Sequence, residues 1–129
     1  MILWEFHGKD NQLWFWDGDM LRNKKFPNKV LDFHFMDYHQ NSWGRVYLHN
    51  EHGEMNQQWS ITNGGDEIIC KYGQDHHQKL RLLLDVYGHK TQNGAKVGCY
   101  PQNGGLNQKW ILSKYFSKFS YFSVLLIFL

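Results

Sequence analysis

A carboxylate, an aromatic ring and two amides stand at defined spacing between residues 85 and 108. Asp85 is followed by Tyr100 and then by the adjacent pair Asn107 and Gln108. A sugar ring needs such groups, because its hydroxyls require donors and acceptors while its apolar C–H face can lie on an aromatic ring. Gly98, in the same segment, offers only its backbone. We therefore predict a shallow carbohydrate site formed by Asp85, Gly98, Tyr100, Asn107 and Gln108, with Asp85 as the strongest contact.

A second set of the same residue types lies upstream. Asp32 is followed by His49 and by the pair Asn56 and Gln57, so an imidazole stands where the first set has a phenol ring. Imidazole offers less stacking area and becomes charged below about pH 6.5. We predict a weaker, pH-sensitive second site at Asp32, His49, Asn56 and Gln57.

A third set, near the N-terminus, is incomplete. Trp4 can serve as a platform and is followed by Asn11 and Gln12, but no aspartate precedes it in the sequence. Without a carboxylate we expect no sugar binding at this position.

The three sets belong to an internal repeat, and the elements of this repeat must position them. The motif Asn-Gln-x-Trp occurs three times, and its tryptophans, Trp14, Trp59 and Trp110, follow one another at intervals of 45 and 51 residues. The second and third copies are preceded by a Leu-Asp pair, at 31–32 and 84–85, which the first copy lacks. We assign the three tryptophans to core packing.

Short apolar runs with period-2 spacing, separated by Gly, Asn, Asp and His, are typical of strands joined by tight turns. Helical periodicity is absent. A complete copy predicts four strands, around Leu-Asp-x, around Val-x-x-ring, around Gln-x-Trp and around a following apolar pair. The predicted fold class is therefore all-β, with threefold internal repetition.

On these residues the chain resembles the ricin B-type lectin domains, which contain three Gln-x-Trp repeats. The resemblance covers residues 1–113 and implies a β-trefoil, a six-stranded barrel capped by three hairpins, with the first repeat N-terminally incomplete. It implies that Asp85, Tyr100 and Asn107 occupy sugar-contacting positions and that the chain is a carbohydrate-binding module without catalysis, for example for galactose-type residues. The implied partner is a carbohydrate or glycoconjugate, with an effector domain fused or associated.

Residues 114–129 depart from the family pattern and form a divergent apolar tail. The repeats supply ten strands where a trefoil has twelve, and two further candidates lie at 118–122 and 124–128. We hypothesise that the tail closes the barrel beside the N-terminal strand. The alternative is a truncated or misread gene product, a lectin fragment without sugar binding, whose apolar tail is an aggregation hazard.

Composition narrows the remaining functions. A chain of 129 residues fits one domain, and a formal net charge of +2 provides no bulk field for nucleic acid or an anionic membrane. The apolar run at 119–129 is shorter than the roughly 20 residues of a membrane-spanning helix. The N-terminus contains no readable signal peptide, whereas the resemblance implies secretion, so the compartment stays open.

Other titratable clusters are better explained by ordinary surface roles. The pairs His49-x-x-His52 and His76-His77 lack a third ligand at consistent spacing, which favours solvated histidines over a metal site. Neither a catalytic residue nor a metal or cofactor is assigned.

Two features of the sequence favour a second function class. The first and second sites are defective, and Cys70 and Cys99, in different repeats, are predicted to be free core residues. The rival function is therefore a degenerate trefoil that acts as a protein-interaction or structural module.

Overall fold

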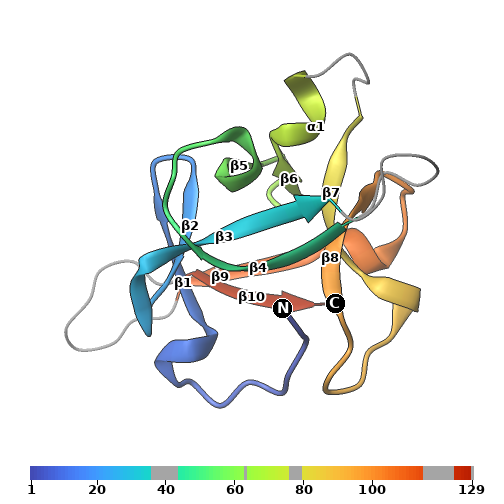
Figure 1. The fold of residues 1–129 in the computed structure, drawn as a ribbon. Helices are drawn as coiled ribbons and strands as arrows, with labels where there is room; N and C mark the ends of the chain where they lie inside the picture. Colours follow the sequence, from blue (N-terminus) through green and yellow to red (C-terminus); the bar gives the residue numbers. More distant parts are fainter. Residues whose placement is uncertain (36–43, 63, 76–79, 115–123, 129) are drawn as a thin grey trace.

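A computed structural model describes residues 1–35, 44–62, 64–75, 80–114 and 124–128. In these residues the chain is all-β, as predicted, and ten strands form one antiparallel sheet that curls on itself (Figure 1). The strands are β1 Leu13–Asp17, β2 Met20–Asn23, β3 Phe26–Phe35, β4 Gly44–Asn50, β5 Trp59–Ile61, β6 Ile68–Cys70, β7 Leu82–Val86, β8 Val97–Pro101, β9 Trp110–Lys114 and β10 Val124–Phe128. Their order across the sheet is β5-β6-β7-β8-β4-β3-β2-β1-β10-β9.

The strands follow the runs that the repeat predicts. In the second copy β3 carries the Leu-Asp pair and forms a hairpin with β4, while β5 begins at Trp59 and pairs with β6. In the third copy β7 and β8 form the equivalent hairpin, and β9 begins at Trp110. The two hairpins meet where β4 pairs with β8.

A short 3-10 helix precedes the tryptophan strand of each copy. These helices are η1 Asp10–Gln12, η2 Met55–Gln57 and η4 Leu106–Gln108, and each ends on the glutamine of the repeated motif. Two residues before each helix a glycine has positive φ, 73° at Gly8, 80° at Gly53 and 74° at Gly104. Because L side chains rarely adopt this conformation, glycine sets the turn in all three copies. The other helical turns are α1 Tyr72–Asp75 and η3 Tyr87–His89.

The C-terminal strand β10 lies inside the sheet. It pairs along its length with β9 and, at Val124 and Leu125, with the start of β1, so the last described residues join the third copy to the first. Detachment of residues 124–129 from the sheet would contradict the hypothesis of a closing tail, and residues 124–128, the part of this segment that the structure describes, are paired within the sheet. The other predicted tail strand, 118–122, lies outside the described residues.

The core is formed by the three motif tryptophans and by apolar residues from strands β1 to β9. Trp14, Trp59 and Trp110 are all buried, which confirms their assignment to the core. The Trp59 indole donates its Nε1 hydrogen to the Leu31 carbonyl, and that of Trp110 donates to the Leu84 carbonyl, both at 3.0 Å. Each indole thereby ties its strand to the Leu-Asp strand of its own copy.

The N-terminal segment of the first copy departs from the prediction of a strand around Trp4. Its only ladder contact among the described residues is an isolated bridge between Ile2 and Lys96. A strand needs a partner along its length, and this copy has no Leu-Asp segment to supply one. The Met1 amino group instead donates to the Val46 carbonyl at 2.8 Å, and burial lowers its pKa.

Two further features concern the whole described chain. Cys70 and Cys99 are free and fully buried, as predicted for core residues. Among the described residues no helix has the length and apolar character needed to cross a membrane.

Candidate functional site

The predicted third-copy site lies on the hairpin of β7 and β8. Asp85 on β7 is directly opposite Gly98 on β8, and Leu83 is opposite Tyr100. Residues two apart on a strand share a face, so Asp85 and Tyr100 are diagonal neighbours on one face of the hairpin. Tyr100 is 37% exposed, as a stacking platform requires.

Two amides clamp the Asp85 carboxylate. Its Oδ2 accepts hydrogen bonds from Asn107 Nδ2 at 2.7 Å and from Gln108 Nε2 at 2.9 Å. Gln108 is itself held by the backbone, because its Nε2 also donates to the Pro101 carbonyl and its Oε1 accepts from Asn103 N. The η4 helix therefore presents both amides to the carboxylate in a fixed orientation.

The other oxygen of Asp85 is available. Oδ1 accepts no hydrogen bond from the residues that the structure describes, and it is not among the fully buried atoms that lack a partner, which are Trp16 Nε1 and Asn107 Oδ1. Asp85 as a whole is only 3% exposed. Burial raises the pKa of Asp85, against the opposite effects of the two amides and of His89. A hydroxyl donor could therefore meet a nearly desolvated carboxylate oxygen here.

Gly98 makes room for the Tyr87 side chain and not for a ligand. A Cβ at this position would overlap the Tyr87 hydroxyl and the Gly44 carbonyl oxygen. The Tyr87 hydroxyl donates to that same carbonyl across the strand. Gly98 thus lies beneath Tyr87, and the side-chain face of the glycine is filled by the protein itself.

The second-copy carboxylate is more heavily engaged. Asp32 Oδ1 accepts from Asn56 Nδ2 at 3.1 Å, and Oδ2 accepts from Gln57 Nε2 at 2.8 Å, so the same two amides engage both oxygens here, whereas in the third copy both donate to Oδ2. A third group, His52 Nε2, lies 3.1 Å from Oδ2. Tyr47, directly opposite Asp32, occupies the place that Gly98 has in the third copy, and burial followed by the Asp32 charge raises its pKa.

His49 lies where the alignment of the copies places it, opposite Val30 on β3. Its ring meets the edge of the Tyr47 ring at 6.0 Å and that of His52 at 5.6 Å, measured between centroids. His52 was not among the predicted site residues. The signal was present in the sequence, because His7, His52 and Asn103 each stand five residues before the motif glutamine.

These three equivalent residues share one backbone contact. The backbone N–H of His7, of His52 and of Asn103 donates to Oε1 of the glutamine of its own copy, at 2.8, 2.9 and 2.9 Å. The position therefore shapes the turn in every copy. Its side chain reaches the carboxylate in the second copy alone among the described contacts.

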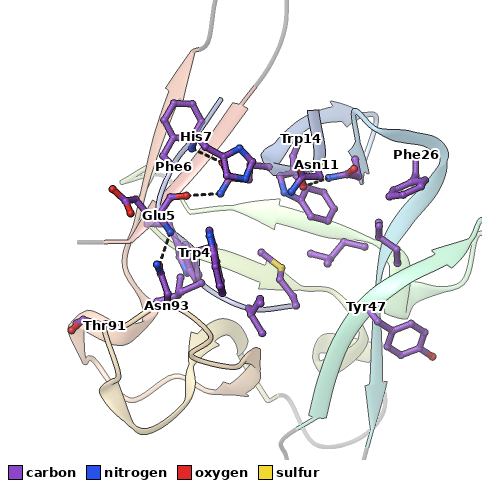
Figure 2. Close-up of a pocket in the computed structure, with 18 residues that line it drawn as sticks. Trp4, Glu5, Phe6, His7, Asn11, Trp14, Phe26, Tyr47, Thr91 and Asn93 are labelled. Carbon is purple, nitrogen blue, oxygen red and sulfur yellow. Dashed lines mark hydrogen bonds between the residues drawn. The ribbon is translucent and has the colours of Figure 1, made fainter. Parts of the chain in front are cut away.

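The first copy contains a cavity of about 980 Å³ where the other copies have an opening strand (Figure 2). Trp14, Asn11 and Gln12 line it, and their equivalents in the other copies contact the Leu-Asp strand. Glu5 N donates to Asn93 Oδ1, and Gln12 Nε2 donates to the Glu5 carbonyl, so the segment beside the cavity is held in place. The cavity therefore lies beside the motif residues whose equivalents contact the Leu-Asp strand in the other copies.

Trp4 stands at the edge of this cavity and is 58% exposed. The only carboxylate among the described residues that line the cavity is the exposed Glu5, which no amide clamp orients. The first copy therefore offers a platform and space, without the oriented acceptor seen at Asp85.

Comparison with known protein families, with curated proteins and with solved structures gives no match to this chain. A function for this chain must therefore be inferred from the repeat and the site themselves.

A carboxylate pair outside the repeat sites is used in ion pairs. Lys109 Nζ lies 3.0 Å from Asp66 and 3.1 Å from Glu67, and Arg81 lies 3.2 Å from Glu67. The Lys109 ammonium lowers the pKa of Asp66. These cations hold the loop between β5 and β6 against the third copy.

Proposed function

We propose that this chain is a ricin B-type β-trefoil that binds carbohydrate through its third copy, without catalysis. One observation carries the proposal, the Asp85 carboxylate, which two amides hold by Oδ2 while Oδ1 stays available next to the exposed Tyr100. Charge-assisted hydrogen bonds are the strongest a neutral sugar can make with a protein. The clamp orients the acceptor before the ligand arrives.

The repeated contacts support the trefoil part of the proposal. The motif glutamine donates to the carbonyl seven residues earlier in every copy, at Glu5, Asn50 and Pro101. The backbone N–H of Trp59 donates to the Asp19 carbonyl, and that of Trp110 donates to the Asp66 carbonyl. Contacts that recur at the repeat interval support three structurally equivalent units.

The geometry assigns a role to each group. One sugar hydroxyl would donate to Asp85 Oδ1, and the C–H face would lie on Tyr100. Asn107 would contribute the Nδ2 hydrogen that Asp85 does not use. A single shallow site of this kind gives a dissociation constant on the millimolar scale, about −4 kcal/mol, so useful avidity requires several copies of the module.

The test is sugar binding by the purified chain, on a glycan array and by calorimetry with galactose. We expect Asp85→Asn and Tyr100→Ala to lose binding, since one removes the charge of the acceptor and the other removes the platform. Asp32→Asn is the matched control, because it changes the equivalent carboxylate of the second copy and should leave binding intact. Near-UV circular dichroism checks that each variant is folded. If Asp85→Asn does not fold, Tyr100→Ala still tests the site, because Tyr100 is exposed.

Two results would contradict the proposal. If Asp85→Asn and Tyr100→Ala both bind sugar as tightly as the unchanged chain does, the site is not in the third copy. If no sugar raises the melting temperature, the interaction-module function is favoured, because a ligand at 100 times its dissociation constant adds about 2.7 kcal/mol to the stability.

A further inference from the structure

The residues Asp32, His49 and His52 form a cluster in the second copy that the sugar-binding proposal does not use. Each offers one ligand atom, and the three atoms all lie within 4.8 Å of one another. Asp32 is buried, and the two histidines are exposed. We propose that this cluster binds a divalent transition-metal ion of the Zn²⁺ type.

The donor set suits such an ion. Neutral imidazole and carboxylate are ordinary Zn²⁺ ligands, at about 2.0–2.2 Å, and three protein ligands leave a position for water. Two such ligands around one ion lie roughly 3.0 Å apart at a right angle and 3.4 Å apart at a tetrahedral angle. His52 Nε2 and Asp32 Oδ2, at 3.1 Å, already have this separation. From the 4.8 Å limit, the ligand atom of the exposed His49 must approach by about 1.4–1.8 Å at most.

The partners of the ligands orient them as metal sites require. His49 Nδ1 lies 3.0 Å from the Asn50 carbonyl oxygen, which can only accept, so the proton sits on Nδ1 and the Nε2 lone pair is free. The Asp32 carboxylate is oriented by the amides of Asn56 and Gln57. Hydrogen bonds from outer groups to ligand side chains set the tautomer and the direction of each ligand.

His52 is the ligand whose proton must move. Its Nδ1 accepts a long hydrogen bond of 3.3 Å from Glu54 N, so in the metal-free protein the proton is on Nε2 and points at Asp32. The metal ion replaces this proton between Nε2 and Oδ2, and the proton moves to Nδ1. The exposed Glu54 N–H then loses His52 Nδ1 as an acceptor and donates to water.

The site belongs to the second copy alone. Asn103 and Tyr100 stand at the equivalent positions of the third copy, and neither is an imidazole. The first copy has His7 at the position of His52, but it has no opening aspartate. His7 is therefore a natural control for nonspecific binding by a histidine in the same turn.

The test is calorimetric titration of the untagged full chain with ZnCl₂, together with the visible spectrum after addition of CoCl₂. We expect one tight ion per chain and the absorption of Co²⁺ bound to nitrogen and oxygen ligands. His49→Gln and His52→Gln should each weaken binding at least tenfold, which is the effect that even outer-shell changes commonly have. His7→Gln and the double variant His76→Gln/His77→Gln should bind as the unchanged chain does.

The proposal is overturned if the chain binds neither ion, or if His49→Gln and His52→Gln retain full affinity. Loss confined to the His76→Gln/His77→Gln variant would place the metal elsewhere and overturn it too. His49 is exposed, so its variant tests the site without disturbing the core. The titration contains no sugar, and its result is independent of the function proposed for the third copy.

Discussion

Asp32 and Asp85 stand at the same place in two copies of the repeat, and among the described residues they differ in whether one or both carboxylate oxygens are engaged. Both are nearly buried, and both accept hydrogen bonds from the asparagine and glutamine amides of their own copy. His52 adds a contact to Asp32, whereas its counterpart Asn103 gives Gln108 a backbone hydrogen bond and does not reach Asp85. The shared scaffold thus positions a carboxylate, and the contacts of the neighbouring side chains differ: Asn56 and His52 engage both oxygens of Asp32 together with Gln57, whereas Asp85 is held by Oδ2.

The first copy shows the same scaffold without a carboxylate. Gln12 accepts from His7 N and donates to the Glu5 carbonyl, which are the two backbone contacts made by Gln57 and Gln108. Only the third contact, to an aspartate, is missing. The glutamine therefore builds the turn whether or not a site forms beside it.

The largest expected effect is on stability, from removing a motif glutamine that also hydrogen-bonds the aspartate of its copy. Gln57 is fully buried and makes three strong contacts, to Asp32, to the Asn50 carbonyl and from His52 N. Gln57→Ala leaves these groups unsatisfied and creates a cavity, so we expect it to lower the free energy of unfolding by about 3 kcal/mol or more. Gln12→Ala, with two contacts and partial exposure, should cost about 1 kcal/mol.

Urea unfolding of the two variants measures this difference. Equal losses would show that the contact to the carboxylate adds nothing and that the glutamine serves the turn alone.

A smaller effect is expected from pH at the third copy. Burial raises the pKa of Asp85, so this carboxyl takes up a proton at a higher pH than an exposed aspartate does. Sugar binding that uses the carboxylate should be complete above this pKa and fall as pH drops through it, by about tenfold for each unit below. Calorimetry with galactose between neutral and acidic pH measures the decline.

His89 supplies the control for the pH effect. Its charge opposes the rise in the Asp85 pKa, so His89→Asn should move the loss of binding to higher pH. Asparagine tolerates the positive φ of 53° at this position. If the pH at which half of the sugar binding is lost does not move in His89→Asn, or if binding persists at acidic pH, then Asp85 does not contact the sugar.

Much of this arrangement could be predicted because it is repeated. Three tryptophans at near-equal intervals located the strands, and the spacing of Asp85, Asn107 and Gln108 correctly anticipated that they meet. Gly8, Gly53 and Gly104 follow the same intervals of 45 and 51 residues, so the turn before each 3-10 helix was also readable. A constraint that recurs three times is visible even in one sequence.

The features that occur once could not be predicted in this way. The Tyr87 hydroxyl above Gly98 depends on how two hairpins meet, and the contact between His52 and Asp32 depends on a turn folding back onto the opening strand. The ligand missing from the pair His49-x-x-His52 is an aspartate 17 residues before His49, on the neighbouring strand. Spacing within a segment carries no information about such a partner.

The smallest effect, and the sharpest comparison, comes from giving the second copy the third copy's residues. The double variant His49→Tyr/His52→Asn places a phenol platform at position 49 and removes the imidazole from Asp32 Oδ2. We expect it to lose Zn²⁺ binding and to double the galactose bound at saturation, a factor of two that calorimetry reports as stoichiometry. Adding Asp32→Asn should abolish the gain. If the folded variant still binds one sugar, then His52 does not decide what this carboxylate binds, and the two remaining differences close the second copy: Asn56 on Asp32 Oδ1, and Tyr47, which lies opposite Asp32 where the third copy has Gly98.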